Sequence, residues 1–275
     1  MAEEWLWKPA AELGRDIDAG RIDARSLTET YLEAIAHHEF TDRIFTAVAP
    51  ERARAEAEAA DARAKSGMRR GPLDGIPISW KDLYDAEGMT TEAGSAFLKG
   101  QVAAKDCPLL ARAGDAGLVF LGKTHLTELA FSGLGVNPIT ATPPNVHDPD
   151  RAPGGSSSGA AASVAYGLSA TAIGSDTGGS VRAPAAWNDL VGLKTTHGRL
   201  PMDGVTPLCP KLDTAGPLCR SVEDAALMRS ALSATPAPDL AGASVEGMRF
   251  RLVNDGGAAH EDPQARAAIE AAAAA

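Results

Sequence analysis

Short apolar segments that alternate with helical ones constrain the fold of this chain most. The segments 76–80, 118–122 and 168–173 are apolar and bounded by turn residues, which is typical of buried strands. A fourth strand is expected over 249–253. Strands that alternate with helices predict an α/β fold, with three layers (α/β/α) around a central mixed, largely parallel sheet.

Helices are expected between these strands. Ser26 as N-cap and Glu29 three residues later form a capping-box pattern at the start of one helix. The segment 51–66 is rich in alanine and in charges spaced one helical turn apart. Shorter helices are expected over 107–116 and 160–166.

We interpret residues 1–275 as a single domain with three parts. Residues 1–70 form a helical N-terminal part, residues 71–233 the core, and residues 234–275 the start of a C-terminal portion. The last nine residues are nearly pure alanine and are typical of a helix that stops early. We therefore expect a longer parent protein, whose remaining strands would cover apolar sheet edges.

Charge and composition exclude several classes of partner. The net charge of −10 argues against a broad nucleic-acid or anionic-membrane surface, which needs clustered Lys and Arg. The acidic N-terminus lacks the features of a secretion signal, and no run has the length of a membrane span. These features predict a cytoplasmic protein without nucleic-acid or membrane partners.

Metal-binding patterns are absent from the sequence. The three cysteines lie far apart, and the six histidines include no His-x-x-x-His pair. We expect three reduced thiols and no zinc site.

Two familiar strings are rejected by their context. Residues 117–124 fit the phosphate-loop pattern, but their middle is four apolar residues that form the strand itself. Residues 155–159 fit the Gly-x-Ser-x-Gly elbow with Ser157 at its centre, but a loop and not a strand precedes them.

Two Gly/Ser runs, 154–159 and 174–180, have the composition of linkers. The second run follows the strand 168–173, and ligand sites in open α/β sheets lie at such strand ends. Successive backbone N–H groups in a glycine-rich turn can form an anion-binding nest. Ser180, which ends this run, could attack a carbonyl while the nest holds the developing oxyanion.

A base is needed to activate such a serine, and no histidine is obviously placed for it. Lys81 follows the apolar strand 76–80 and lies between Trp80 and Leu83. A sheltered lysine can serve as a base if desolvation lowers its pKa from about 10.4.

Five ordered blocks of the sequence resemble the amidase signature family. They are GIPISWKD (75–82), GKTHLTELAF (122–131), PGGSSSG (153–159), GSDTGGSVRAPAA (174–186) and VGLK (191–194). The resemblance runs from about residue 10 to about residue 255, and 1–275 would then be one amidase signature domain.

The resemblance implies a Ser-cisSer-Lys triad with Ser180 as nucleophile, Ser156 as the bridging cis-serine and Lys81 as base. It implies an oxyanion nest made by the N–H groups of Thr177, Gly178, Gly179 and Ser180. The neutral lysine would draw a proton through the bridging serine, and an acyl-enzyme would form from an amide. The implied partner is a small-molecule amide substrate, and no cofactor is implied.

Several further residues carry supporting roles or depart from the family pattern. Ser157 is expected to support the lysine by hydrogen bonding, and Asp176 and Arg182 to form a buried pair that supports the loop. Carboxylate binding by Arg182 is the alternative. Asp189 is either solvated, ion-paired or a determinant of substrate polarity. Other departures lie at Ser158, Asn188, Thr195–His197 and His125, and the two histidines are interpreted as structural.

The favoured function is an amidohydrolase that releases a carboxylic acid and ammonia or an amine. The first alternative is the amidase (glutaminase) subunit of a tRNA-dependent amidotransferase. Residues 131–137 lack that subunit's expected version, and Ala183 stands where glutamine is common in it. The second alternative is a non-catalytic binding protein of the same fold. A homodimer is compatible with either class.

Overall fold

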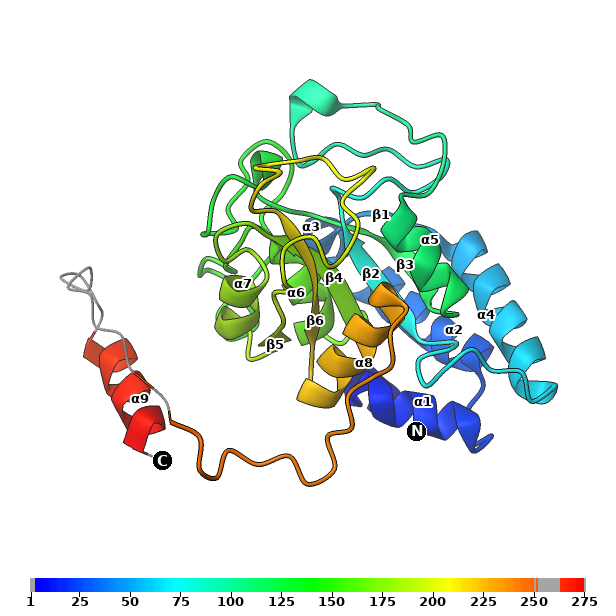
Figure 1. The fold of residues 1–275 in the computed structure, drawn as a ribbon. Helices are drawn as coiled ribbons and strands as arrows, with labels where there is room; N and C mark the ends of the chain where they lie inside the picture. The colour runs from blue at the N-terminus through cyan, green and yellow to red at the C-terminus, as the bar shows by residue number, and fades with distance from the viewer. Residues whose placement is uncertain (1–2, 250, 252–262, 275) are drawn as a thin grey trace. The chain divides into compact units, whose positions relative to one another are not determined.

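A computed structural model describes residues 3–249, 251 and 263–274 of the 275-residue chain. The chain divides into two compact units, Met1–Pro238 and Asp239–Ala275, which are described separately. The first unit contains the sheet (Figure 1) and the residues of the candidate site. Its α-helices are α1 (Ala10–Asp18), α2 (Ala24–His37), α3 (Thr41–Ile44), α4 (Pro50–Lys65), α5 (Pro108–Asp115), α6 (Ser158–Ala165), α7 (Arg182–Trp187) and α8 (Val222–Ser233). Short 3-10 helices are η1 (Glu3–Trp7), η2 (Ala96–Leu98) and η3 (Glu128–Ala130).

The described strands of this unit form one six-stranded sheet in the order β1-β3-β2-β4-β6-β5. They are β1 (Phe45–Val48), β2 (Pro77–Lys81), β3 (Val119–Thr124), β4 (Thr171–Asp176), β5 (Val191–Gly192) and β6 (Thr214–Cys219). The central strand β2 is parallel to both β3 and β4, whereas the three outer pairings are antiparallel. The predicted α/β fold with a mixed sheet is confirmed, and parallel pairing is confined to the three central strands.

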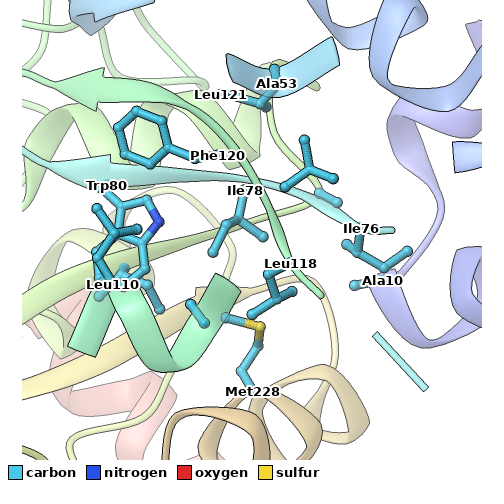
Figure 2. Close-up of a cluster of buried hydrophobic side chains, with 14 of the residues drawn as sticks. Ala10, Ala53, Ile76, Ile78, Trp80, Leu110, Leu118, Phe120, Leu121 and Met228 are labelled. Atoms are coloured by element: carbon cyan, nitrogen blue, oxygen red, sulfur yellow. The ribbon is translucent and has the colours of Figure 1, made fainter. Parts of the chain in front are cut away.

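Helices cover both faces of the sheet, and alternation along β2 shows how. The hydroxyl of Ser79 lies 2.8 Å from that of Ser163 in α6, so Ser79 points to the α6 face. Its neighbours Ile78 and Trp80 must point to the opposite face because side chains alternate along a strand. There they lie with Leu110 of α5 and Met228 of α8 (Figure 2).

The two faces of the sheet are packed by different kinds of side chain. Large apolar residues fill the α5 and α8 face, where the Trp80 ring meets Tyr84 edge-on at 5.2 Å between ring centroids. The α6 face is packed by small side chains such as Ala160, Ala161 and Ala172. A side chain at Gly159 would lie 2.6 Å from the Ile44 carbonyl oxygen, so glycine is required for α6 to approach this closely. The N-terminus of α6 thereby lies against the end of α3 and against His125, the residue that follows β3.

The three strands predicted within the core occur as β2, β3 and β4, each shifted by one to three residues toward the C-terminus. β1, β5 and β6 were not predicted. β5 has only two residues and β6 contains Gly216 and Pro217, so neither shows a strand pattern in sequence. Phe250, Leu252 and Val253 of the fourth predicted strand lie outside the described residues.

The predicted helices occur as α2, α4, α5 and α6, but the capping box at Ser26 is wrong. Asp23 is the N-cap of α2, and its carboxylate accepts a hydrogen bond from the Ser26 N–H at 2.7 Å. Glu29 instead pairs with Arg54 of α4. Aspartate and serine are comparable N-caps, and here the helix begins three residues earlier, so that Ser26 lies in its first turn and its N–H is bound by Asp23.

The second unit, Asp239–Ala275, contains α9 (Pro263–Ala274) among its described residues. The division of the chain into three parts of one domain stays a prediction. No helix within the described residues is long and apolar enough to cross a membrane.

Replacement of Ile78 by alanine should destabilise the first unit, because Ile78 is 1% exposed in the centre of the sheet. We expect the free energy of unfolding to fall by about 2–5 kcal/mol, measured by equilibrium denaturation in urea. Ile139→Ala is the matched control. That side chain is 45% exposed, and its loss should change the free energy by less than about 0.5 kcal/mol. Equal effects of the two substitutions would contradict the assigned core.

Candidate active site

Lys81 is the last residue of β2 and is fully buried. Its strand lies between β3 and β4, so the backbone that carries it is flanked by a strand on each side. The Nζ atom donates hydrogen bonds to Ser156 Oγ at 2.7 Å and to Ser175 Oγ at 2.9 Å. A lysine predicted to follow an apolar strand thus ends in contact with two buried hydroxyls.

The environment of Lys81 favours its neutral form. Burial lowers the pKa of Lys81 to about 7, although the carboxylates of Asp176 and Asp213 act in the opposite direction. No carboxylate oxygen is within hydrogen-bond distance of Nζ among the described residues. Desolvation therefore outweighs attraction, and the amine can lose its proton near neutral pH.

Ser156 follows a cis peptide bond from Gly155 and is fully buried. The turn that carries it is bound to residues between Thr127 and Gly135. The N–H of Gly155 donates to the Gly133 carbonyl at 2.8 Å, and the N–H of Thr127 donates to the Ser156 carbonyl at 3.2 Å. A side chain at Gly155 would lie 2.6 Å from the Gly135 nitrogen. Glycine at this position allows the two segments to approach.

Ser180 ends the second Gly/Ser run, which begins in the last residues of β4 and continues past it, and Ser180 is 9% exposed. Its carbonyl accepts a hydrogen bond from the Ser157 N–H at 3.2 Å. The two runs, 154–159 and 174–180, therefore meet through their backbones. The structure brings Lys81 and Ser156 into direct contact and places Ser180 against the residue that follows Ser156.

The loop from Thr177 to Ser180 presents free backbone donors. Within the described residues, no hydrogen bond uses the N–H of Thr177, Gly178 or Ser180. The N–H of Gly179 differs, since it donates to the Asp176 carboxylate at 2.8 Å. Of the residues that the family resemblance assigns to the nest, Gly179 is thus already bound within the protein.

Asp176 and Arg182 form the expected ion pair, but only its acidic half is buried. Asp176 is fully buried, whereas the Arg182 side chain is 52% exposed. Arg182 donates from Nε to Asp176 Oδ2 at 3.0 Å and from Nη2 to Asp176 Oδ1 at 2.9 Å. Burial alone would raise the pKa of Asp176, but the hydrogen bonds from Arg182 and from the Val181 N–H hold it below its usual value.

Within the described residues Ser157 makes no hydrogen bond to Lys81, so the direct support that we expected is not seen. Its hydroxyl donates to the Ser175 carbonyl and accepts from the Ser175 N–H, both at 3.2 Å. Ser175 provides the second hydroxyl at the amine, and sequence reasoning missed it. Its place within the second Gly/Ser run, next to Asp176, was the available signal.

The departures from the family pattern have structural positions. Asn188 is buried, and its amide donates to the carbonyls of Pro153 and Pro184. Asp189 is exposed, and no ion pair within the described residues includes it. His125 is buried, whereas His197 is exposed and lies 3.0 Å from the Pro210 carbonyl oxygen. Ser158 is buried in the first turn of α6.

A buried ion pair next to Lys81 was also missed by sequence reasoning. Lys123 of β3 lies 2.5 Å from Asp82, and both side chains are almost fully buried. Lys123 also donates to Thr91 Oγ1 at 2.9 Å. The pair ties the residue after Lys81 to the neighbouring strand. The phosphate-loop match that contained Lys123 is indeed a strand.

The described part of the chain contains no cluster of side chains that could bind a metal ion. No group of three or more His, Cys, Asp or Glu side chains there could hold a metal ion. Cys107, Cys209 and Cys219 are free thiols.

Comparison with known proteins gives the family. The family model described as Amidase matches residues 26–251, and the chain belongs to this family. A peptide amidase from Stenotrophomonas maltophilia superposes with a TM-score of 0.76 at 38% identity, covering 85% of this chain and 51% of that chain.

Two curated relatives have different names. A glutamyl-tRNA(Gln) amidotransferase subunit of Thermobifida fusca is 40% identical over 92% of this chain and 53% of its own length. The 2-amino-5-chloromuconic acid deaminase of Comamonas testosteroni is 41% identical over 96% of this chain and 59% of its own length. The chain thus spans little more than half the length of these relatives.

Gly174→Ala should disturb the contacts around the Lys81 amine. An added methyl group would lie 2.6 Å from Ser157 Oγ and 2.9 Å from Leu218 Cδ1, so Ser157 must move. We expect the free energy of unfolding to fall by about 1–3 kcal/mol in urea denaturation. Gly114→Ala is the matched control, because its methyl group meets no atom within 4 Å, and it should cause no loss. Unchanged stability of Gly174→Ala would contradict the described packing.

Proposed function

We propose that this protein is an amidohydrolase that cleaves a carboxamide C–N bond through a serine acyl-enzyme. Ser180 is the nucleophile, Ser156 the proton relay and Lys81 the base. The observation that carries the proposal is the buried Lys81 amine, which has a pKa of about 7 and lies 2.7 Å from Ser156 Oγ. A structural lysine has no need of such an environment, whereas a base that works near neutral pH does.

The first half-reaction transfers the acyl group. The lone pair of the neutral Lys81 amine accepts the Ser156 hydroxyl proton, and Ser156 takes the proton of Ser180. The Ser180 Oγ atom then forms a bond to the amide carbon, and the carbonyl oxygen becomes an oxyanion. The free N–H groups of Thr177, Gly178 and Ser180 can stabilise that charge, and Gly179 can join them only by weakening its bond to Asp176.

The second half of the cycle restores the enzyme. As the C–N bond breaks, Ser156 donates a proton to the leaving nitrogen and regains one from Lys81, which leaves the acyl group on Ser180. Water then attacks the acyl carbon as it loses a proton to the same relay. The bond between that carbon and Ser180 Oγ breaks, and the relay returns the proton to Ser180. The products are a carboxylic acid and ammonia or an amine. Every proton moves between side chains, substrate and water, so the mechanism uses no cofactor.

A glutaminase role within a tRNA-dependent amidotransferase is the second candidate. It is supported by the 40% identity to the glutamyl-tRNA(Gln) amidotransferase subunit from Thermobifida fusca. The amidohydrolase is favoured over this role by Ala183, which lies next to Arg182 and the candidate nucleophile loop. By the family resemblance, glutamine is common at this position in the amidotransferase subunit. Ammonia release from glutamine that depends on a co-purified partner would support the second candidate.

We also expect a cytoplasmic protein that acts on a small amide.

A fluorophosphonate probe should label Ser180, which mass spectrometry of the modified peptide can identify. Ser180→Ala should abolish labelling. Lys81→Ala should stay folded and lower the labelling rate about 100- to 10,000-fold, the usual contribution of a general base. Both effects follow from the assigned roles of nucleophile and base.

The controls are Ser66→Ala and Lys99→Ala, since both residues are exposed surface positions and should leave the labelling rate unchanged. Absence of labelling in the folded wild-type protein would reject the acyl-enzyme proposal and favour a non-catalytic binding protein. An unfolded Lys81→Ala variant would instead assign that lysine a structural role.

A further inference from the structure

Asp213 is a carboxylate outside the triad with an unusual set of partners. It is 5% exposed and directly precedes β6. It accepts hydrogen bonds from Thr177 Oγ1 at 2.5 Å, from the Leu208 N–H at 3.0 Å and from the Cys209 N–H at 3.0 Å. No ion pair within the described residues includes Asp213. A buried carboxylate is thus held by neutral donors alone, and such burial costs free energy unless every oxygen is satisfied.

Both oxygens of Asp213 are needed in this arrangement. Oδ1 accepts from Thr177 and Cys209, and Oδ2 accepts from Leu208 and Cys209. An asparagine would place an NH₂ group against at least one of these donors, whichever way its amide is turned. The site therefore requires a carboxylate, although its shape would admit an amide.

Thr177 is the residue through which this carboxylate can hold the candidate oxyanion nest. It is the first residue after β4, and the next two residues, Gly178 and Gly179, have no side chains. Glycines lose the most conformational freedom on ordering, so a loop of this kind needs external contacts to keep one conformation. Thr177 is the side chain between β4 and Ser180 that can supply such a contact.

The nest is bound to two carboxylates on different elements. Asp176 of β4 binds the Gly179 N–H, and Asp213 binds the Thr177 side chain. Thr214, the neighbour of Asp213, donates its hydroxyl to the Asp176 carbonyl at 2.8 Å. Together these contacts fix both ends of the turn from Thr177 to Gly179.

The segment that binds Asp213 also reaches the residues after Lys81. The N–H of Thr206 donates to the Leu83 carbonyl, and the N–H of Asp85 donates to the Gly204 carbonyl, both at 2.9 Å. Residues 204–209 therefore contact the chain after the candidate base at one end and the Asp213 carboxylate at the other.

We propose that Asp213 is a positioning residue that acts through Thr177 to hold the backbone N–H groups of the nest where an oxyanion forms. This inference rests on the proposed acyl-enzyme function. It adds to that function a residue that touches neither substrate nor triad.

The first test is a double-mutant cycle of Thr177→Val and Asp213→Asn, with the fluorophosphonate labelling rate of Ser180 as readout. Each single variant should lower the maximal labelling rate about tenfold to a hundredfold with unchanged probe affinity, because misplaced donors fail in the transition state. The double variant should be no slower than the slower single variant, since both remove one contact. Thr177→Ser, which keeps the hydroxyl, should recover most of the labelling rate that Thr177→Val loses.

The control variants Thr196→Val and Asp203→Asn, at exposed positions between β5 and β6, should leave the labelling rate unchanged. A wild-type labelling rate in Thr177→Val, or effects of the two substitutions that multiply, would overturn the proposal. Thr177→Val replaces the hydroxyl with a methyl group of similar size, so it decides the matter even if Asp213→Asn fails to fold.

The second test is independent of catalysis. Amide hydrogen exchange of Gly179 and Val181, whose N–H groups bind Asp176, should become faster in Thr177→Val than in the wild type and in Thr196→Val. Unchanged exchange would overturn the positioning role. Failure of the wild type to label, together with faster exchange in Thr177→Val, would reject the proposed function and retain the positioning role of Asp213.

Discussion

The site depends on the burial of one lysine amine at the end of the central strand. The Lys81 amine is fully buried and hydrogen-bonded to the hydroxyls of Ser156 and Ser175. Burial lowers the pKa of Lys81 to about 7. A charged amine would be costly there, whereas a neutral amine is satisfied by hydroxyl partners. The neighbouring positions follow from this constraint. Gly174 leaves room for Ser157, Ser157 holds the backbone of Ser175, and Ser175 and Ser156 meet the amine.

A second constraint keeps the glycine-rich loop in one conformation. Asp176 is the last residue of β4, and Asp213 directly precedes the neighbouring antiparallel strand β6. Each carboxylate accepts a hydrogen bond from the loop. Within the described residues Asp176 has a cationic partner, Arg182, which is half exposed, and Asp213 has none. Backbone N–H groups thus supply most of the polar contacts that offset burial of these carboxylates. The contacts that hold the loop use the Thr177 side chain and the Gly179 N–H. The N–H groups of Thr177, Gly178 and Ser180 are therefore left available to an oxyanion.

The sequence predicted the central strands and the order of the chemical groups, because apolar runs and the glycine-serine blocks are local signals. It did not predict β6, which is fully buried but contains Gly216 and Pro217. Both residue types are uncommon inside strands, so the segment lacks a strand pattern. It placed the N-cap of α2 at Ser26, since Asp23 and Ser26 are both good caps and only the structure shows which one binds. Ser175 and Asp213 were missed for a different reason. Their partners lie 94 and 36 residues away in the chain, and no spacing rule joins residues across a sheet.

The central claim is that Lys81 loses its proton near neutral pH, and its side-chain NMR signal tests this most directly. The Lys81 ¹³Cε resonance, assigned by its absence in Lys81→Arg, should titrate with a midpoint near 7 in the folded protein. The amine would then be mainly neutral at pH 8 and protonated at pH 6. A midpoint above about 10, the ordinary range of lysine, would contradict the account.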